Sequence, residues 1–272
     1  MVIPKTIEEI IDTINLCKNI NISYYVIGNG SNLLVGDKGY DGVIIKINGE
    51  FSKVNISKYS EEDNTYLVRA EAGISLSKLA DKIAEEELKG FEFASGIPGT
   101  VGGAVTMNAG AYGGEIKDCI YSVTVLDQDD NLKKLYKDDL ELAYRSSVIQ
   151  KKGYVALEAE FIFEKGNYKE IIEKMTDLNN RRKEKQPLEH YSAGSTFKRP
   201  EGYYAGKLIM DSELAGYLIG GAQVSTKHCG FIINTGKASA KDLLDLIEYV
   251  KEVVYNKYGV ELEREVKTLG NF

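Results

Sequence analysis

The segment from Ser95 to Gly114 constrains the fold more than any other part of this chain, because glycine recurs throughout it (S-G-I-P-G-T-V-G-G-A-V-T-M-N-A-G-A-Y-G-G). Glycine has no Cβ atom, so backbone amides in such a segment can approach a ligand closely. Pro98 fixes its own φ and favours an extended Ile97, and apolar residues such as Val101 are unusual in flexible linkers. We therefore expect a shaped loop that contacts phosphate or a cofactor. A glycine-rich corner of a β domain is the alternative.

The composition is that of a globular protein of about two domains. The chain has 272 residues, of which 43% are hydrophobic, so it can bury a substantial core. No apolar run approaches the roughly 20 residues of a membrane-spanning helix. Residues 1–10 include Pro4, Lys5, Glu8 and Glu9, which is not the pattern of a signal peptide. These features predict a cytoplasmic protein without a membrane partner.

Cysteines and histidines are few and widely spaced. Cys17, Cys119 and Cys229 form no C-x-x-C pair, so we expect reduced, structural cysteines. His190 and His228 lie in no metal-binding pattern, and we predict no metal.

The formal net charge of −7 argues against a nucleic-acid partner, which would require broad neutralisation of phosphates. An anionic ligand would have to be bound locally. One basic group, Arg181, Arg182, Lys183 and Lys185 before Pro187, offers such a site. The alternative is a set of cations that stabilise the C-terminus of a helix.

Capping residues and hydrophobic periodicity predict an alternation of helices and strands. A capping box at Thr6 and Glu9 opens the first helix, and Ser75 caps the second. The first predicted helix keeps its apolar spacing as far as Cys17, and the others cover about 76–90, 167–186 and 239–258. The predicted strands are Ser23–Ile27, Val43–Ile47, Ser122–Leu126, Tyr154–Phe163 and Val260–Lys267. A loop-rich stretch precedes Gly236.

Two nucleotide-binding motifs are absent. In G-N-G-S-N-L from Gly28, the Rossmann pattern would need glycine in place of Leu33 and a helix directly afterwards. In G-Y-Y-A-G-K from Gly202, the glycines are too close for a Walker loop, and Leu208 stands where Ser or Thr must hold magnesium. A Rossmann dinucleotide site and P-loop phosphoryl transfer are therefore not expected.

Three other segments carry candidate chemistry. Arg145 lies beside three hydroxyls in Y-R-S-S, where it could bind a carboxylate or phosphate, or form a surface salt bridge. Ser195 follows a glycine and could be a proton donor or a turn residue. It is not expected to be a triad nucleophile, because the G-x-S-x-G motif is absent. In the predicted last strand, alternation places Glu261, Glu263 and Glu265 on one face, which indicates a solvated acidic face.

Together these segments resemble the UDP-N-acetylenolpyruvoylglucosamine reductases, and the resemblance covers nearly the whole chain. The motifs follow one another in the family's order: G-N-G-S-N-L-L-V from Gly28, G-I-P-G-T-V-G-G-A from Gly96, M-N-A-G-A-Y-G from Met107, Y-R-S-S from Tyr144, K-Q-P from Lys185, A-G-S-T-F-K-R-P from Ala193, G-G-A-Q-V from Gly220 and E-V-K from Glu265.

The resemblance implies an α+β fold with an FAD-binding domain of the vanillyl-alcohol-oxidase type, followed by a smaller α+β substrate-binding domain. The FAD-binding domain would span 1–165, in lobes of about 1–53 and 54–165. The second domain would span 166–272, with the last strand returning towards the active site. The resemblance also implies that FAD contacts Gly28, Asn29, Gly30, Ser31, Asn32, Ile97, Pro98, Gly99, Thr100, Val101, Gly102 and Gly103.

The activity that the resemblance implies is the NADPH-dependent reduction of UDP-N-acetylglucosamine enolpyruvate to UDP-N-acetylmuramate, a step of peptidoglycan synthesis. Matched to the motifs, Arg145 holds the substrate carboxylate, Ser195 supplies a proton, and Glu265 is a further acid or polarising partner. The residues that resemble contacts to diphosphate, uridine or carboxylate are Tyr144, Arg181, Lys185, Lys198 and Gln223.

The chain departs from the family pattern in two places. The interval from Arg145 to Arg181 is short and lacks a long substrate-covering loop, which resembles the shorter, type II class. Before the first capped helix, a T-x-x-x-G-G-like segment that is usual in the family is absent from this sequence. A non-catalytic flavin or nucleotide-sugar binding protein therefore remains an alternative, as does an alcohol or sugar oxidase that shares the flavin domain.

Overall fold

The computed structural model describes residues 1–272 and contains two compact units. Unit 1 comprises Met1–Gly30 and Gly42–Asn180, and unit 2 comprises Ser31–Asp41 and Arg181–Phe272. Unit 1 extends past the predicted domain boundary, because helix α5 (Tyr168–Lys185) buries Ile171 and Met175 in the core of unit 1. The division into domains at residues 165 and 166 stays a prediction.

The first part of unit 1 packs a helix on a pair of parallel strands. Helix α1 (Ile7–Asn19) buries Ile10 and Ile14 against β1 (Tyr24–Ile27) and β3 (Val43–Lys46). The Thr6 hydroxyl accepts a hydrogen bond from the Glu9 backbone N–H at 3.2 Å, which confirms the predicted cap. The Glu9 carboxylate accepts from the Lys5 N–H instead of closing the reciprocal half of a capping box.

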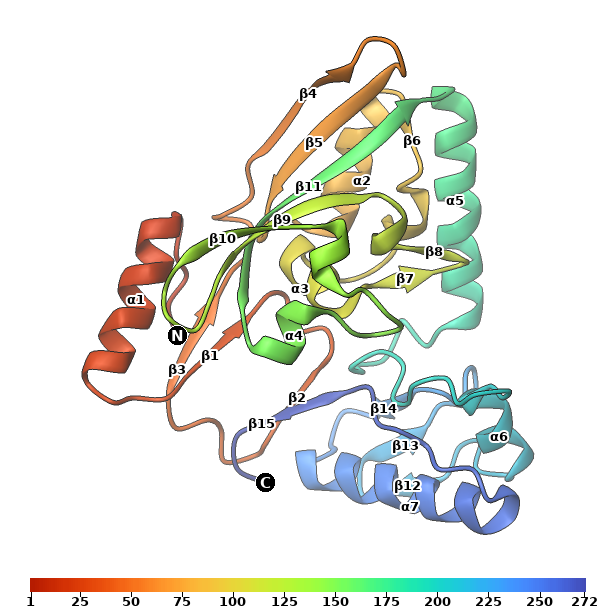
Figure 1. The fold of residues 1–272 in the computed structure, drawn as a ribbon. Coiled ribbons are helices and arrows are strands. Elements are labelled where there is room, and N and C mark those ends of the chain that lie inside the picture. The colour runs from red at the N-terminus through yellow and green to blue at the C-terminus, as the bar shows by residue number, and fades with distance from the viewer. The chain divides into compact units, whose positions relative to one another are not determined.

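The main sheet of unit 1 has six antiparallel strands (Figure 1). Their order is β10-β9-β11-β5-β4, and β6 pairs with the end of β11. Side chains alternate between the two faces, so Val68 and Ala70 of β5 are buried whereas Arg69 is exposed. The strands are β4 (Val54–Ser60), β5 (Thr65–Glu71), β6 (Leu88–Lys89), β9 (Ile120–Leu126), β10 (Leu132–Tyr136) and β11 (Val155–Lys165).

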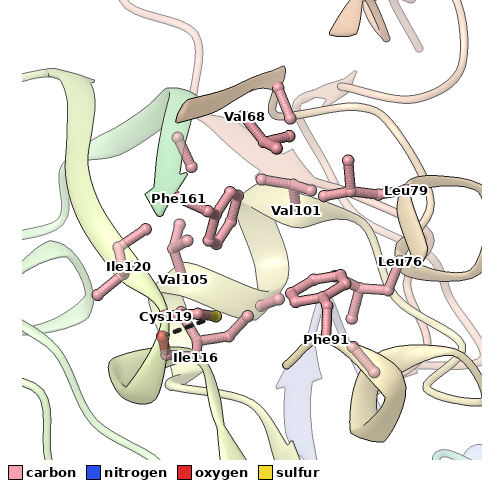
Figure 2. Packing of buried hydrophobic residues seen from close by; sticks show 14 of the residues in the cluster. Val68, Leu76, Leu79, Phe91, Val101, Val105, Ile116, Cys119, Ile120 and Phe161 are labelled. Carbon is pink, nitrogen blue, oxygen red and sulfur yellow. Dashed lines mark hydrogen bonds between the residues drawn. The ribbon is translucent and has the colours of Figure 1, made fainter. Parts of the chain in front are cut away.

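Helices cover one face of this sheet and enclose an apolar core. Figure 2 shows Phe161 of β11 near Val105 and Val101, with Phe91 and Leu79 close by. The covering helices are α2 (Leu76–Glu85), α3 (Val101–Met107) and α5, and shorter elements complete the unit: η1 (Glu92–Ala94), β7 (Gly110–Ala111), β8 (Gly114–Glu115), η2 (Ile116–Asp118), η3 (Lys137–Leu140) and α4 (Val148–Lys152).

The glycine-rich segment differs from the expected loop, because its centre forms helix α3. Thr100 caps this helix, and its hydroxyl accepts from the Gly103 N–H at 3.5 Å. Val101, Ala104 and Val105 are buried in the sheet core, and this burial outweighs the weak helix propensity of two glycines. Helix α2 also ends earlier than expected, at the C-cap Glu86 and not at Gly90.

Unit 2 packs helix α7 (Ala240–Tyr258) on a three-stranded sheet of order β12-β13-β14. Helix α7 begins where the sequence predicted a helix, and Ser239 and Asp242 form a capping box at its start. The loop-rich stretch expected before Gly236 contains four short elements that the sequence did not indicate: α6 (Ala205–Asp211), β12 (Leu218–Ile219), β13 (Ala222–Val224) and β14 (Ile232–Asn234).

The predicted last strand, Val260–Lys267, is wrong. The only strand in this region is β15 (Lys267–Leu269), which pairs in parallel with β2 (Leu33–Val35). Leu262 and Val266 are nevertheless buried and Glu261 and Glu263 are exposed. Alternation therefore predicted the burial of these four residues correctly, whereas Glu265, expected on the solvated face, is half-buried. A ladder also needs hydrogen-bonding partners along its length.

The three cysteines are free and buried, as expected. Burial raises the pKa of the Cys119 thiol, which donates to the Ile116 carbonyl in the core of unit 1 (Figure 2). A thiol held protonated in this way is unreactive. No helix of the structure is long and apolar enough to cross a membrane.

Asp127, at the turn between β9 and β10, gives a prediction for acid stability. Its carboxylate accepts from Lys133 Nζ at 2.6 Å and from the Asn131 N–H at 2.8 Å. The Lys133 contact, together with the hydrogen bond from the Asn131 N–H, lowers the pKa of Asp127 to about 2. Its stabilising effect is therefore complete above the unfolded-state pKa of about 3.9 and is lost as the pH falls towards 2.

We expect Asp127→Asn to lower the free energy of unfolding at pH 7, and the difference from wild type to shrink between about pH 5 and pH 2. Urea unfolding across this pH range measures the difference in free energy of unfolding. Glu62→Gln, which changes an exposed carboxylate, is the control. A difference that stays constant with pH would contradict the expectation.

Candidate active site

Two glycine motifs that are far apart in the sequence meet in unit 1. A Cβ atom on Gly28, which directly follows β1, would lie 2.3 Å from Thr100 Oγ1. The turn G-N-G and the segment I-P-G-T-V-G-G are therefore in close contact, and only glycine permits this approach. This arrangement is the one expected if both segments face one cofactor.

Hydrogen bonds to the neighbouring chain fix the second motif in place. The Leu76 N–H donates to the Gly99 carbonyl at 3.0 Å, and the Val101 N–H donates to the Ile74 carbonyl at 2.9 Å. The Gly102 N–H donates to the Ala72 carbonyl at 2.8 Å, and a Cβ atom on Gly102 would lie 2.9 Å from the Ala72 methyl group. These hydrogen bonds fix the backbone conformation of the loop beside Gly28.

Other groups in this region are suited to a phosphate. The backbone N–H groups of Gly28, Asn29 and Gly30 donate to no acceptor within the protein. Gly30 has a left-handed φ of +70°, and nothing lies within 4 Å of its Cβ position. Gly103 is exposed, and the nearest atom to its Cβ position, at 3.8 Å, is the capping hydroxyl of Thr100. Successive amides beside open space fit the diphosphate of FAD.

Arg145 lies at the tip of a tight turn in unit 1. The N–H groups of Ala143 and Ser146 each donate to the other residue's carbonyl, both at 3.1 Å, and Arg145 has a left-handed φ of +53°. Its guanidinium donates to the Gly110 carbonyl at 3.4 Å and lies 5.2 Å from the centre of the Tyr144 ring. The turn fixes the direction in which this half-buried side chain leaves the backbone.

Ser195 and Glu265 lie on neighbouring extended segments in unit 2. The Thr196 N–H donates to the Gly230 carbonyl at 2.8 Å, and the Glu265 N–H donates to the Thr196 carbonyl at 2.9 Å. An isolated bridge between Phe197 and Arg264 continues the pairing. The structure thus brings together two of the three predicted catalytic residues, although 69 positions separate 195 from 265 in the sequence.

Asn32, from the first glycine motif, joins this pair. Its side-chain amide donates to the Glu265 carbonyl at 3.2 Å, and its own carbonyl accepts from the Lys267 N–H at 3.1 Å. The Gly194 Cβ position is 4.0 Å from the Ser31 carbonyl oxygen. One end of the predicted cofactor turn is therefore anchored directly beside the predicted proton donor.

His228 supports the Ser195 segment from its other side. Its Nδ1 accepts a hydrogen bond from the Gly230 N–H at 3.1 Å, and its ring packs edge-on against Phe231. Burial lowers the pKa of His228, which favours the neutral ring that this bond requires. Ser195 in turn bridges to Phe231.

The residues predicted to contact the substrate have varied surroundings. Lys185 and Arg181 are exposed near the end of α5, and Tyr144 is exposed at its turn. Lys198 forms an ion pair with Glu263, and the Gln223 amide donates to the Gly216 carbonyl at 3.1 Å. Their roles in binding stay predictions.

Comparisons with known proteins define the class of protein to which this chain belongs. Residues 1–136 match the model of an FAD-binding domain family, and residues 186–269 match that of the C-terminal domain of UDP-N-acetylenolpyruvoylglucosamine reductase. With the α+β fold, these matches define an FAD-dependent oxidoreductase, and the expected α+β fold with an FAD-binding domain is confirmed.

Relatives extend the match to the whole chain. UDP-N-acetylenolpyruvoylglucosamine reductases of Lachnoclostridium phytofermentans and Alkaliphilus oremlandii are each 55% identical over 99% of this chain and 86% of their own length. The crystal structure of the Thermus caldophilus enzyme is 33% identical, with a TM-score of 0.79 over 98% of this chain and 91% of that one. This chain belongs to the UDP-N-acetylenolpyruvoylglucosamine reductase family. Neither alternative, a sugar or alcohol oxidase or a non-catalytic binding protein, is favoured.

Proposed function

We propose that this protein reduces the enolpyruvyl ether of UDP-N-acetylglucosamine enolpyruvate to UDP-N-acetylmuramate, with NADPH as the source of hydride, in cytoplasmic peptidoglycan precursor synthesis. The observation that supports it best is the hydrogen bond between Glu265 and Thr196, which places the segment of Ser195 next to that of Glu265, with Asn32 of the flavin motif bonded to Glu265. A positioned proton donor next to a flavin-binding turn is what reduction of a polarised double bond requires. Membership of the family gives the substrate.

The turn residues would hold the cofactor in this scheme. Backbone N–H groups of Gly28, Asn29 and Gly30 are directed to no protein acceptor and would bind the diphosphate, with the Ile97–Gly103 segment against the other side. When bound, FAD would supply the chemistry of hydride transfer between NADPH and the β carbon of the enolpyruvyl group. The remaining chemistry falls to the protein's side chains.

Arg145 would stabilise the charge that develops on the substrate. Addition of hydride at the β carbon places an electron pair on the α carbon, conjugated with the carboxylate. A guanidinium can form two parallel hydrogen bonds with that carboxylate, and it stays charged at any physiological pH. The turn that fixes Arg145 limits the reorganisation needed when charge appears.

Ser195 would complete the reaction by protonating the α carbon. Its O–H bond breaks as the new C–H bond forms, and the serine oxygen then regains a proton from solvent. A serine is a weak acid in water, so this step requires a strongly basic enolate in a site that excludes water. Glu265, on the adjoining segment, would polarise the reacting group or act as a further acid.

The substrate's remaining charges would be met by Tyr144, Arg181, Lys185, Lys198 and Gln223. Two of these residues already have partners in the protein: Lys198 pairs with Glu263, and Gln223 donates to Gly216. Substrate phosphate would compete with Glu263 for the lysine. Lys198 would then contribute to binding, and Lys198→Ala would raise KM more than it changes kcat.

A product assay tests the proposed function. We expect the flavin-loaded protein to convert UDP-N-acetylglucosamine enolpyruvate into a product heavier by two hydrogen atoms, one NADPH being oxidised for each product molecule. Mass spectrometry and NADPH absorbance measure the two quantities under anaerobic conditions. Protein stripped of flavin is the control. Consumption of NADPH without conversion of the enolpyruvyl compound would contradict the proposal.

A further inference from the structure

The side chain of Asn108, from the motif M-N-A-G-A-Y-G, joins three structural elements beside Arg145. Asn108 follows helix α3 as its C-cap, with a left-handed φ of +44°, and it is fully buried. Its amide nitrogen donates to the Ala143 carbonyl at 3.1 Å and to the Glu115 carboxylate at 2.9 Å. Its amide oxygen accepts from the Lys117 N–H at 2.9 Å.

These contacts require asparagine specifically. The Lys117 N–H can be met only by the amide oxygen, so the two N–H bonds of the amide must face Ala143 and Glu115. Asparagine is also among the few residues that readily adopt a left-handed backbone. Aspartate would fit the backbone, but it would place negative charge against a carbonyl and a carboxylate.

The Ala143 contact bears directly on Arg145. The carbonyl of Ala143 accepts from both the Ser146 N–H and the Asn108 amide, so a partly buried hydrogen bond joins the turn to the end of α3. A further bond, from the Ser147 hydroxyl to the Thr106 carbonyl at 2.7 Å, holds the chain after the turn. Asn108 therefore restrains the side of the turn that leads into Arg145.

The second contact controls a nearby charge. The Glu115 carboxylate accepts from Asn108 and from Lys117 Nζ, the latter at 2.8 Å. The bond from Lys117 lowers the pKa of Glu115 despite its partial burial, and Asn108 and the charge of Arg145 act in the same direction. Glu115 is thus an anion near Arg145, and Asn108 fixes where that anion sits.

We infer that Asn108 is a positioning residue for the reaction: it holds the Arg145 turn and the Glu115 carboxylate so that the guanidinium meets the substrate carboxylate in one geometry. The inference rests on the carboxylate-binding role proposed for Arg145. The sequence motif was recognised, but no role for this residue followed from it.

Asn108→Gly is the first test, because glycine retains the left-handed backbone while the amide and its three hydrogen bonds are lost with the side chain. We expect flavin reduction by NADPH to change by less than about twofold, whereas reduction of the enolpyruvyl substrate falls by roughly 10- to 100-fold, as expected when a catalytic group is misplaced. Gln150→Leu is the matched control. It removes a partly buried hydrogen bond to Met107 at the same α3–α4 contact and leaves the Arg145 turn intact.

A double mutant separates positioning from general support. If Asn108 acts through Arg145, Asn108→Gly should slow reduction of the enolpyruvyl substrate by no more than about threefold when Arg145→Lys is already present. An equal loss in both backgrounds would overturn the inference. So would an equal loss of both half-reactions in Asn108→Gly alone.

Ligand binding gives a readout that is independent of turnover. By calorimetry, we expect Asn108→Gly to weaken the binding of UDP-N-acetylmuramate, which carries the carboxylate, about 10-fold. The binding of UDP-N-acetylglucosamine, which lacks the carboxylate, should weaken by less than about twofold. Equal weakening of the two ligands would refute the inference. A wild-type protein that binds neither ligand would instead refute the proposed function.

Asn108→Asp provides a pH signature if the glycine variant is unstable. A neutral aspartic acid can donate one hydrogen bond, whereas its anion is repelled by Glu115 and by the Ala143 carbonyl. The defect in substrate reduction should therefore shrink as the pH falls, relative to wild type at each pH. A pH-independent defect, or loss of flavin from both variants, would show that Asn108 serves only the fold.

Discussion

Ser195→Ala should leave the reduction of bound flavin by NADPH unchanged and slow the reduction of the enolpyruvyl substrate by about 10²- to 10⁴-fold, the range for loss of a positioned proton donor. The substitution removes one oxygen atom from a segment held by backbone bonds of Thr196 to Gly230 and to Glu265. The local fold does not depend on that hydroxyl. Stopped-flow measurement of the two half-reactions separates the effects.

Ser192→Ala is the matched control, because it removes an exposed hydroxyl from the same loop. It should leave both half-reactions within about twofold of wild type. If Ser195→Ala slows both half-reactions equally, Ser195 supports flavin binding or folding, and its assignment as proton donor is wrong.

The second large effect is expected from Gly28→Ala, which should yield protein with little bound flavin and a lower unfolding temperature. The new methyl group would stand 2.3 Å from Thr100 Oγ1 and 3.3 Å from Thr100 Cβ, in a buried contact that cannot give way freely. Overpacking of this kind costs about 1–3 kcal/mol. Any retreat of Thr100 also disturbs the cap of α3 at the predicted FAD segment.

Absorbance of the purified protein and thermal unfolding measure this effect. Gly49→Ala is the control, because nothing lies within 4 Å of its Cβ position. Removing the obstructing hydroxyl should partly rescue the variant, so Gly28→Ala with Thr100→Ala should be less destabilised than the sum of the single changes. Full flavin content and wild-type stability in Gly28→Ala would contradict the proposed contact.

Local signals predicted the long helices because each has an identifiable start and an apolar face. Thr6 and Ser75 cap α1 and α2 as expected, and Ile171 and Met175 mark the buried side of α5. The short elements of unit 2 escaped prediction because two or three residues show no period. Helix α3 escaped because its stability comes from burial of Val101 and its neighbours rather than from propensity.

Pairing between distant segments was not accessible to sequence reasoning. The residues 31–41 belong to unit 2 because β2 pairs with β15, and because the Asp37 carboxylate accepts from the Ala240 N–H at 2.8 Å, at the start of α7. Nothing local in residues 31–41 indicates a partner more than 200 positions away. The same non-local pairing brings Asn32 to Glu265.

The candidate site divides in the same way. Side-chain chemistry left Arg145, Ser195 and Glu265 each with a structural alternative, and only the order of the motifs selected them. The structure adds that Ser195 and Glu265 lie on paired segments and that Gly28 touches Thr100. Asn108 was missed because a buried amide has no sequence signal beyond its motif.

Anaerobic titration tests the central claim most directly. We predict that one equivalent of NADPH bleaches the flavin absorbance of the purified protein, and that UDP-N-acetylglucosamine enolpyruvate, added after the oxidised nicotinamide is removed, restores it with formation of one equivalent of UDP-N-acetylmuramate. Absorbance that stays bleached in the presence of the enolpyruvyl substrate, and returns only when oxygen is admitted, would contradict the account.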